Sequence, residues 1–155
     1  MLPKSHLLLG TILVSILFLF FPWVGIINLI LVLLSTTFID VDHYFYYIFK
    51  KRNLNLITAY KWYMNRARKF HSLSVAEKKK LYHGFLIFHG FESLLILFLL
   101  GFFVSKIFYF ILTGFSFHLF LDIFIEAIYY DEFNKISILY NLIKKRKLKL
   151  VDDLD

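Results

Sequence analysis

Histidines and carboxylates lie inside, or at the edge of, segments apolar enough to span a membrane. Three stretches carry them: Ile39-Asp40-Val41-Asp42-His43, Phe88-His89-Gly90-Phe91-Glu92, and His118-Leu119-Phe120-Leu121-Asp122, with Glu126 one turn later. An ionised group at the centre of a spanning helix costs roughly 2.5–3.5 kcal/mol on insertion scales. We therefore expect these residues to share one compensating site. Imidazole and carboxylate groups suit a divalent metal, with zinc expected first and manganese second.

The spacing within each stretch favours paired ligands. Residues three or four apart share one face of a helix, and such pairs are Asp40 with His43, His89 with Glu92, and His118 with Asp122. Facing helices that each supply a carboxylate and an imidazole build metal sites in helix bundles. The predicted metal ligands are His6, Asp40, Asp42, His43, His89, His118 and Asp122.

This set is large enough for two metals, or for one metal with further carboxylates that orient its imidazoles. Glu92 and Glu126 are predicted to act as the general base or as orienting groups. His83 lies at a segment boundary, and the alternatives of ligand, proton carrier and interface residue stay open. For any single residue, the simpler interpretation is a hydrogen bond to a neighbouring helix.

The composition is that of a membrane protein. The chain has 155 residues, of which 59% are hydrophobic and 21% aromatic, whereas a soluble domain is about 45–50% apolar. There is no cysteine, so thiolate ligands and disulfides are excluded. The first apolar run lacks a small-x-small cleavage site, so we interpret it as a retained helix rather than a signal peptide.

The apolar segments predict an all-α bundle of four transmembrane helices. Residues 7–39 are too long for one crossing of a ~30 Å hydrocarbon core, and Pro22 and Gly25 favour a turn between two helices. We expect one domain over residues 1–130, with helices at about 7–21, 25–40, 84–103 and 107–130.

The cytoplasmic loop 44–82 is polar and basic. Within it, Leu56, Tyr60, Tyr63 and Phe70 recur at helical spacing, which predicts an amphipathic helix lying either on a membrane surface or on the protein's own cytoplasmic face. The run Ser74-Val75-Ala76-Glu77 is a capping box and predicts a helix that continues into the third membrane segment. Residues 131–155 are predicted to be a basic cytoplasmic tail.

The charges predict the topology. Of the 18 Lys and Arg residues, only Lys106 falls in an outer turn, so the positive-inside rule places both termini in the cytoplasm. With that topology the candidate ligands all lie in the cytoplasmic half of the bundle. The basic loop is expected to attract anionic lipid headgroups. It lacks the aromatic interleaving of a nucleic-acid platform, so no nucleic-acid partner is expected.

Three motifs resemble those of membrane-bound, predicted metal-dependent hydrolases, a family that includes the LexA-regulated inner-membrane hydrolases. These are His6 at the head of the first helix, Asp40-Val41-Asp42-His43 at the end of the second, and Gly114-x-x-x-His118-x-x-x-Asp122 in a later helix. The middle motif departs from the family's His-Arg-Gly and Thr-His-Ser, because this chain reads His83-Gly84-Phe85-Leu86-Ile87-Phe88-His89-Gly90.

The resemblance implies a hydrolase acting on a phosphoester, because such helical His/Asp sites look similar to those of zinc-dependent phospholipases C. A site open to the cytoplasmic leaflet would make a lipid or lipid-linked phosphate the natural substrate. The alternative is a non-catalytic protein, either a metal-ion carrier or a structural partner whose polar groups pair across helices. A carrier needs access from both sides, and the outer turns have no candidate ligand.

Overall fold

The computed structural model describes residues 3–78, 80–82, 86–130, 137 and 149–150. The elements are, in chain order, α1 (Pro3–Phe20), the 3-10 turn η1 (Pro22–Val24), α2 (Ile26–Phe38), α3 (Val41–Lys51), α4 (Leu56–Ser72), α5 (Val75–Lys78), β1 (Leu81–Tyr82), α6 (Phe91–Phe103), α7 (Ile107–Tyr130) and β2 (Lys149–Leu150). Apart from the short parallel pair of β1 and β2, the described secondary structure is helical, which confirms the predicted class.

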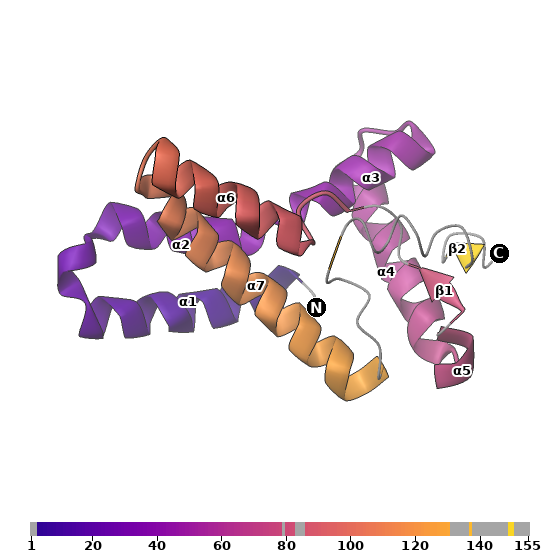
Figure 1. Ribbon diagram of the computed structural model, residues 1–155. Helices are drawn as coiled ribbons and strands as arrows, with labels where there is room; N and C mark the ends of the chain where they lie inside the picture. Colours follow the sequence, from indigo (N-terminus) through magenta and orange to yellow (C-terminus); the bar gives the residue numbers. More distant parts are fainter. Residues whose placement is uncertain (1–2, 79, 83–85, 131–136, 138–148, 151–155) are drawn as a thin grey trace.

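Four apolar helices form a bundle (Figure 1). The long α7 packs against α2 and α6, and α2 also packs against α1. The predicted turn between the first two helices is confirmed: Pro22 opens η1, and Gly25 has φ +81, a left-handed value that glycine adopts without steric cost.

Within the described residues, two helical stretches are long and apolar enough to cross a membrane, namely Ile26–Lys51 and Ile107–Ile128. The apolar helices Lys4–Phe20 and Phe91–Phe103 are shorter. The distribution of polarity is the reverse of that in a water-soluble domain. Large apolar side chains such as Leu19, Trp23 and Phe103 are exposed, while His89 and His118 are among the most buried side chains in the described residues.

The third apolar helix begins later than predicted. Residues 86–90 are not helical, and α6 begins at Phe91, so the predicted helix from 84 to 103 is wrong in its first part. The backbone N–H of Phe88 donates to Oδ2 of Asp42 over 3.0 Å. This bond and the extended Gly90 at the N-cap hold the segment against the bundle, where a continuous helix would turn His89 away from Asp42.

The second helix also ends differently. It stops at Phe38, and a new helix, α3, begins at Val41, so Asp42 and His43 open α3 rather than close α2. Backbone hydrogen bonds between residues three positions apart mark the junction, including the one from the His43 N–H to the Asp40 carbonyl over 3.1 Å. The junction therefore directs several polar side chains of one short segment to the same side.

The Ser74 capping box forms, but it starts only a short helix. Ser74 donates to Oε2 of Glu77 through its hydroxyl at 2.7 Å and its backbone N–H at 2.8 Å, and these bonds lower the pKa of Glu77. The helix α5 ends at Lys78, and β1 follows at Leu81, so the predicted continuation into the membrane segment is wrong. Most of the predicted tail, 131–155, lies outside the described residues.

The predicted amphipathic helix is present as α4. Its first turn is capped by Asn55, whose Oδ1 accepts from the backbone N–H groups of Ile57 at 2.9 Å and Thr58 at 3.0 Å. Replacing Asn55 by alanine is expected to lower the free energy of unfolding by about 1 kcal/mol, because both donors lose their partner. Chemical denaturation measures this. Asn55→Asp keeps the acceptor and should stay near the wild-type value; equal losses in the two variants would contradict the capping role.

Candidate metal centre

Separate elements carry the predicted ligands to one place. His6 comes from α1, Asp40 from the α2–α3 junction, and His89 from the non-helical segment before α6, while His118 and Asp122 lie one turn apart on α7. Except for Asp40, which is slightly exposed, these side chains are almost fully buried. Residues distant in the sequence therefore converge in the interior, as expected if these polar groups share one site that compensates for their burial.

Four atoms in this cluster form a compact set. Nε2 of His89 and Nε2 of His118 are 3.3 Å apart. Oδ1 of Asp40 lies 3.4 Å from the His89 nitrogen and 3.6 Å from the His118 nitrogen. Oδ2 of Asp122 lies 3.7 Å and 3.4 Å from the same two nitrogens. We call these four atoms the tetrahedral set.

These separations match the ligand shell of a small divalent cation. With bonds of about 2.0–2.1 Å, as in zinc sites, the edge of a ligand tetrahedron is about 3.3–3.4 Å. The five separations above lie between 3.3 and 3.7 Å. Each of these five pairs of donors is therefore spaced about as two ligands of one small cation are.

The other ring nitrogens fix the tautomers of both histidines. Nδ1 of His118 lies 2.7 Å from the carbonyl oxygen of Thr36, which can only accept, so this nitrogen carries the proton. Nδ1 of His89 lies 2.9 Å from Oδ2 of Asp42, and an ionised carboxylate likewise only accepts. In the neutral rings both Nε2 atoms are then acceptors that face each other and two carboxylate oxygens. A shared proton would join only two of these atoms, whereas a bound cation would be offered acceptor atoms from all four residues.

Hydrogen bonds within the described residues leave several further polar atoms unsatisfied. Both ring nitrogens of His6, Oδ2 of Asp40 and Oδ1 of Asp42 are buried and make no hydrogen bond there. A buried polar atom without a partner costs about 1–3 kcal/mol. Several such atoms around one cluster indicate that the site is built for a group besides the protein's own side chains.

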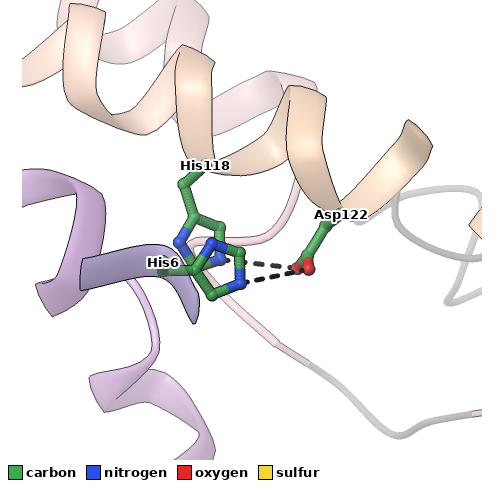
Figure 2. A group of neighbouring side chains, drawn as sticks. All are labelled: His6, His118 and Asp122. Atoms are coloured by element: carbon green, nitrogen blue, oxygen red, sulfur yellow. Dashed lines mark ion pairs between the residues drawn. The ribbon is translucent and has the colours of Figure 1, made fainter. Parts of the chain in front are cut away.

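Two more histidines flank the tetrahedral set. Figure 2 shows the His6 ring stacked on that of His118, with both rings facing the carboxylate of Asp122. Nε2 of His6 lies 3.3 Å from Oδ1 of Asp122, and Nε2 of His43 lies 3.6 Å from Oδ1 of Asp40. Two triads within the described residues have ligand atoms close enough to hold a metal: His6 with His118 and Asp122, and Asp40 with His43 and His89.

The structure places Asp42 on the far side of His89. Its Oδ2 accepts from Nδ1 of His89 and from the Phe88 N–H, the arrangement in which a carboxylate orients a metal-binding imidazole. These contacts assign Asp42 an orienting role, and its direct ligation stays a prediction.

Replacing Asp42 by alanine is expected to weaken metal affinity by about 10–100-fold, because His89 loses the group that fixes its ring and tautomer. Titration of chelator-treated protein with zinc measures the change. Asp42→Asn retains an amide oxygen that can accept from Nδ1, so it should lose less. An alanine variant with wild-type affinity would contradict the orienting role.

Thr36 was not among the predicted site residues. The last carbonyls of a helix have no partner within it, and α2 ends two residues after Thr36, which leaves the Thr36 carbonyl available to His118. The sequence signal was weak, since it required knowing that α2 ends before Asp40 rather than running through it.

A close helix contact brings His118 to that carbonyl. A Cβ atom added at Gly114, one turn before His118, would lie 2.5 Å from the backbone oxygen of Val32 and would also meet the Ser35 hydroxyl. Only glycine therefore lets α7 approach α2 this closely. The glycine in the Gly114-x-x-x-His118-x-x-x-Asp122 motif has a packing role beside the ligands.

Other predicted site residues lie differently. His89 does not share a helical face with Glu92, because it precedes α6; Glu92 is in the first turn of α6 and its Oε1 accepts from the Ser137 hydroxyl at 2.5 Å. Glu126 is buried on α7, one turn beyond Asp122. Neither glutamate belongs to the ligand groups found among the described residues. His83 lies outside the described residues.

Comparison with known proteins adds no relative. No protein-family model, curated protein or solved structure matches the chain. Residues of this chain alone therefore define the class of site, a buried cluster of histidines and aspartates that could hold a metal ion.

Proposed function

We propose that this chain is a membrane-embedded, metal-dependent hydrolase that acts on a lipid or lipid-linked phosphoester at the cytoplasmic leaflet. The observation that supports a bound metal is the tetrahedral set. Its four atoms are all hydrogen-bond acceptors, because the protons of His89 and His118 lie on their Nδ1 atoms and bond elsewhere. The chemistry that a divalent ion supplies in such a site is acidification of a bound water and polarisation of the scissile oxygen.

The donors favour zinc as the proposed ion. Two imidazole nitrogens and two carboxylate oxygens suit zinc first, whereas manganese prefers more oxygen ligands and an octahedral shell. If His6 and His43 also ligate, two ions would be held by separate triads, one of His6, His118 and Asp122 and one of Asp40, His43 and His89. Metal analysis per chain distinguishes one ion from two.

The proposed membrane arrangement has four crossings, by α1, α2, α6 and α7, with both termini cytoplasmic. At 13 residues each, α2 and α6 are about 20 Å long and would not span the hydrocarbon core alone. The α2 crossing would continue through the junction into α3, within the stretch Ile26–Lys51. Non-helical backbone is tolerated at membrane depth where protein covers it, and the segment before α6 contains the buried Leu86 and His89. This segment would complete the third crossing.

Within the site, different groups of the protein would have different roles. Asp42 and the Thr36 carbonyl orient His89 and His118. Glu126, buried one turn below Asp122, and Glu92, at the start of α6, are the proposed general base or orienting groups. The apolar surroundings would exclude bulk water from the cluster, and the substrate's acyl chains would stay in the leaflet.

Metal content and hydrolysis, measured on the same purified protein, test this proposal. We expect stoichiometric zinc by elemental analysis and chelator-sensitive hydrolysis of para-nitrophenyl phosphorylcholine. His118→Ala should lose both, whereas Thr113→Ala should lose neither, because Thr113 lies on the same helix and bonds only the Tyr109 carbonyl of its own helix.

Other results would favour the alternatives. Bound metal without hydrolysis of phosphodiester or carboxylic ester probes would indicate a non-catalytic metal protein. Metal flux in proteoliposomes would indicate a carrier. Metal-free protein whose stability is unchanged by chelator would reject the metal centre itself.

A further inference from the structure

The helix α4 has one face that the described residues leave uncovered. Its inner face, with Ala59, Arg66 and Phe70, is buried, and its polar face carries the exposed Lys61 and Asn65. The third face consists of Leu56, Ile57 and Tyr60, all exposed. An ordinary amphipathic helix packed on its own protein would have only the first two faces.

Contacts with α3 hold α4 in this orientation. The Tyr47 hydroxyl lies 2.9 Å from the Thr58 hydroxyl, and Tyr44 donates to the Leu54 carbonyl at 2.5 Å. The guanidinium of Arg66 lies over the rings of Tyr46, Trp62 and Tyr63, at 5.4–5.8 Å. Because these contacts fix the rotation of α4, the third face cannot turn inward.

The uncovered face continues onto the tip of the α3–α4 hairpin. Phe49 near the end of α3 is 82% exposed, and Leu54 in the connecting loop is 72% exposed. We call the whole surface the hairpin ridge; it consists of Phe49, Leu54, Leu56, Ile57 and Tyr60. Several exposed apolar side chains on neighbouring turns and the adjoining loop, with basic residues beside them, favour a protein or membrane contact.

The charges around the ridge select between those two partners. Lys50, Lys51, Arg52 and Lys61 are exposed beside it, and no Asp or Glu occurs between His43 and Glu77. A surface with this single sign of charge would repel a second copy of itself. Apolar side chains flanked by basic ones complement the acyl boundary and phosphates of an anionic leaflet.

We propose that the hairpin ridge inserts into the headgroup region of an anionic leaflet, held there by the surrounding lysines and arginine. The inference rests on the proposed membrane location of the bundle. It adds a second, interfacial contact with the bilayer. Through the contact of Tyr63 with His43, whose ring centroids are 5.0 Å apart, the seated hairpin would also define how a lipid headgroup approaches the metal centre.

Site-directed spin labelling tests the contact in the full-length chain, which has no native cysteine to remove. Labels would be placed at Ile57→Cys on the ridge, Asn65→Cys on the polar face of α4, and Phe102→Cys on the exposed side of α6. The proteins would be reconstituted into phosphatidylcholine vesicles with or without phosphatidylglycerol. Accessibility to oxygen and to a water-soluble nickel chelate reports whether each label lies in lipid or in water.

In anionic vesicles we expect the label at 57 to be open to oxygen and protected from nickel, and the label at 65 to be open to nickel. Changing Lys50, Lys51 and Lys61 to glutamine should lower the equilibrium constant for insertion by about fivefold per residue, and removing phosphatidylglycerol should act in the same direction. Equal nickel access at 57 and 65, with the label at 102 in lipid, would overturn the inference and leave the membrane location standing.

Two other results would also overturn it. Protection of the label at 57 from both reagents, in detergent as well as in vesicles, would mean that protein covers the ridge, either a second copy or the chain's own C-terminal segment. Nickel access at 102 would remove the membrane location itself, and with it the proposed leaflet contact.

Discussion

Changing Asp122 to alanine is expected to weaken metal binding by about two to three orders of magnitude. Its Oδ2 lies 3.7 Å from Nε2 of His89 and 3.4 Å from that of His118, and its Oδ1 lies 3.3 Å from Nε2 of His6. One carboxylate therefore faces three imidazoles. A structural zinc site is worth about 10–16 kcal/mol, so removing one of four ligands should weaken affinity on the order of 100- to 1,000-fold.

Elemental analysis and zinc titration measure this loss, and Asp122→Asn controls for the fold. Asparagine preserves the shape of the side chain but not its charge, so this variant should keep the helical circular-dichroism spectrum and still lose most of its metal. Chelator should lower the thermal stability of the wild type, because its buried carboxylates and imidazoles would lose the ion between them, and should have little effect on Asp122→Ala. Wild-type affinity in both variants would show that the tetrahedral set is not the metal centre.

Changing Gly114 to alanine is expected to disturb the fold and the site together, because the new methyl group meets the Val32 backbone oxygen at 2.5 Å. Backbone cannot turn aside as a side chain does, so α2 and α7 must separate. Overpacking of this kind costs about 1–3 kcal/mol, and separation of the helices draws His118 away from the Thr36 carbonyl. Gly114→Leu, which adds more volume, should fail to bind metal.

Gly101→Ala is the matched control. Its methyl group meets the ring of Tyr109 at 2.6 Å, which is a side chain at the α6–α7 contact rather than backbone. We expect lower stability but unchanged metal affinity. Denaturation curves and zinc titrations on the same samples separate the two effects. If Gly114→Ala retains wild-type metal affinity, the close α2–α7 approach does not position the centre.

Both predictions depend on a feature that distinguishes this chain from an ordinary helical bundle. In the described residues, the interior of the bundle is polar, because His6, His118 and Asp122 are buried there, and its surface is apolar. In water, both the buried polar groups and the exposed apolar side chains would cost free energy. A bilayer removes the cost of the surface, and a bound cation would remove the cost of the centre.

Local spacing was enough to predict part of the site. Residues i and i+4 on a helix are neighbours whatever the rest of the fold does, and His118 and Asp122 on α7 confirm this. The contact of Asp40 with His43 likewise follows from an i, i+3 relation. The predicted bounds of the last apolar helix, 107–130, agree with α7, because a long and mostly apolar segment without Pro favours helix.

Tertiary structure decided which of these local pairs meet and what each group does. His89 was expected to pair with Glu92, but its backbone is not helical, and its nitrogens instead lie 3.4 Å from Asp40 and 2.9 Å from Asp42. Asp42 and Asp40 look equivalent in the sequence, and only the approach of the segment before α6 separates an orienting carboxylate from one in the tetrahedral set.

The same holds for the role of Thr36, whose carbonyl meets His118 only because α2 ends early and α7 lies close against it. The sequence by itself thus determined the chemical inventory and the pairs along each helix, because side-chain period is a local property of the backbone. The contacts between segments were decided by where the helices end and by the glycine that lets α7 approach α2 closely. These depend on packing between residues far apart in the sequence, such as Thr36 and His118, which are 82 positions apart.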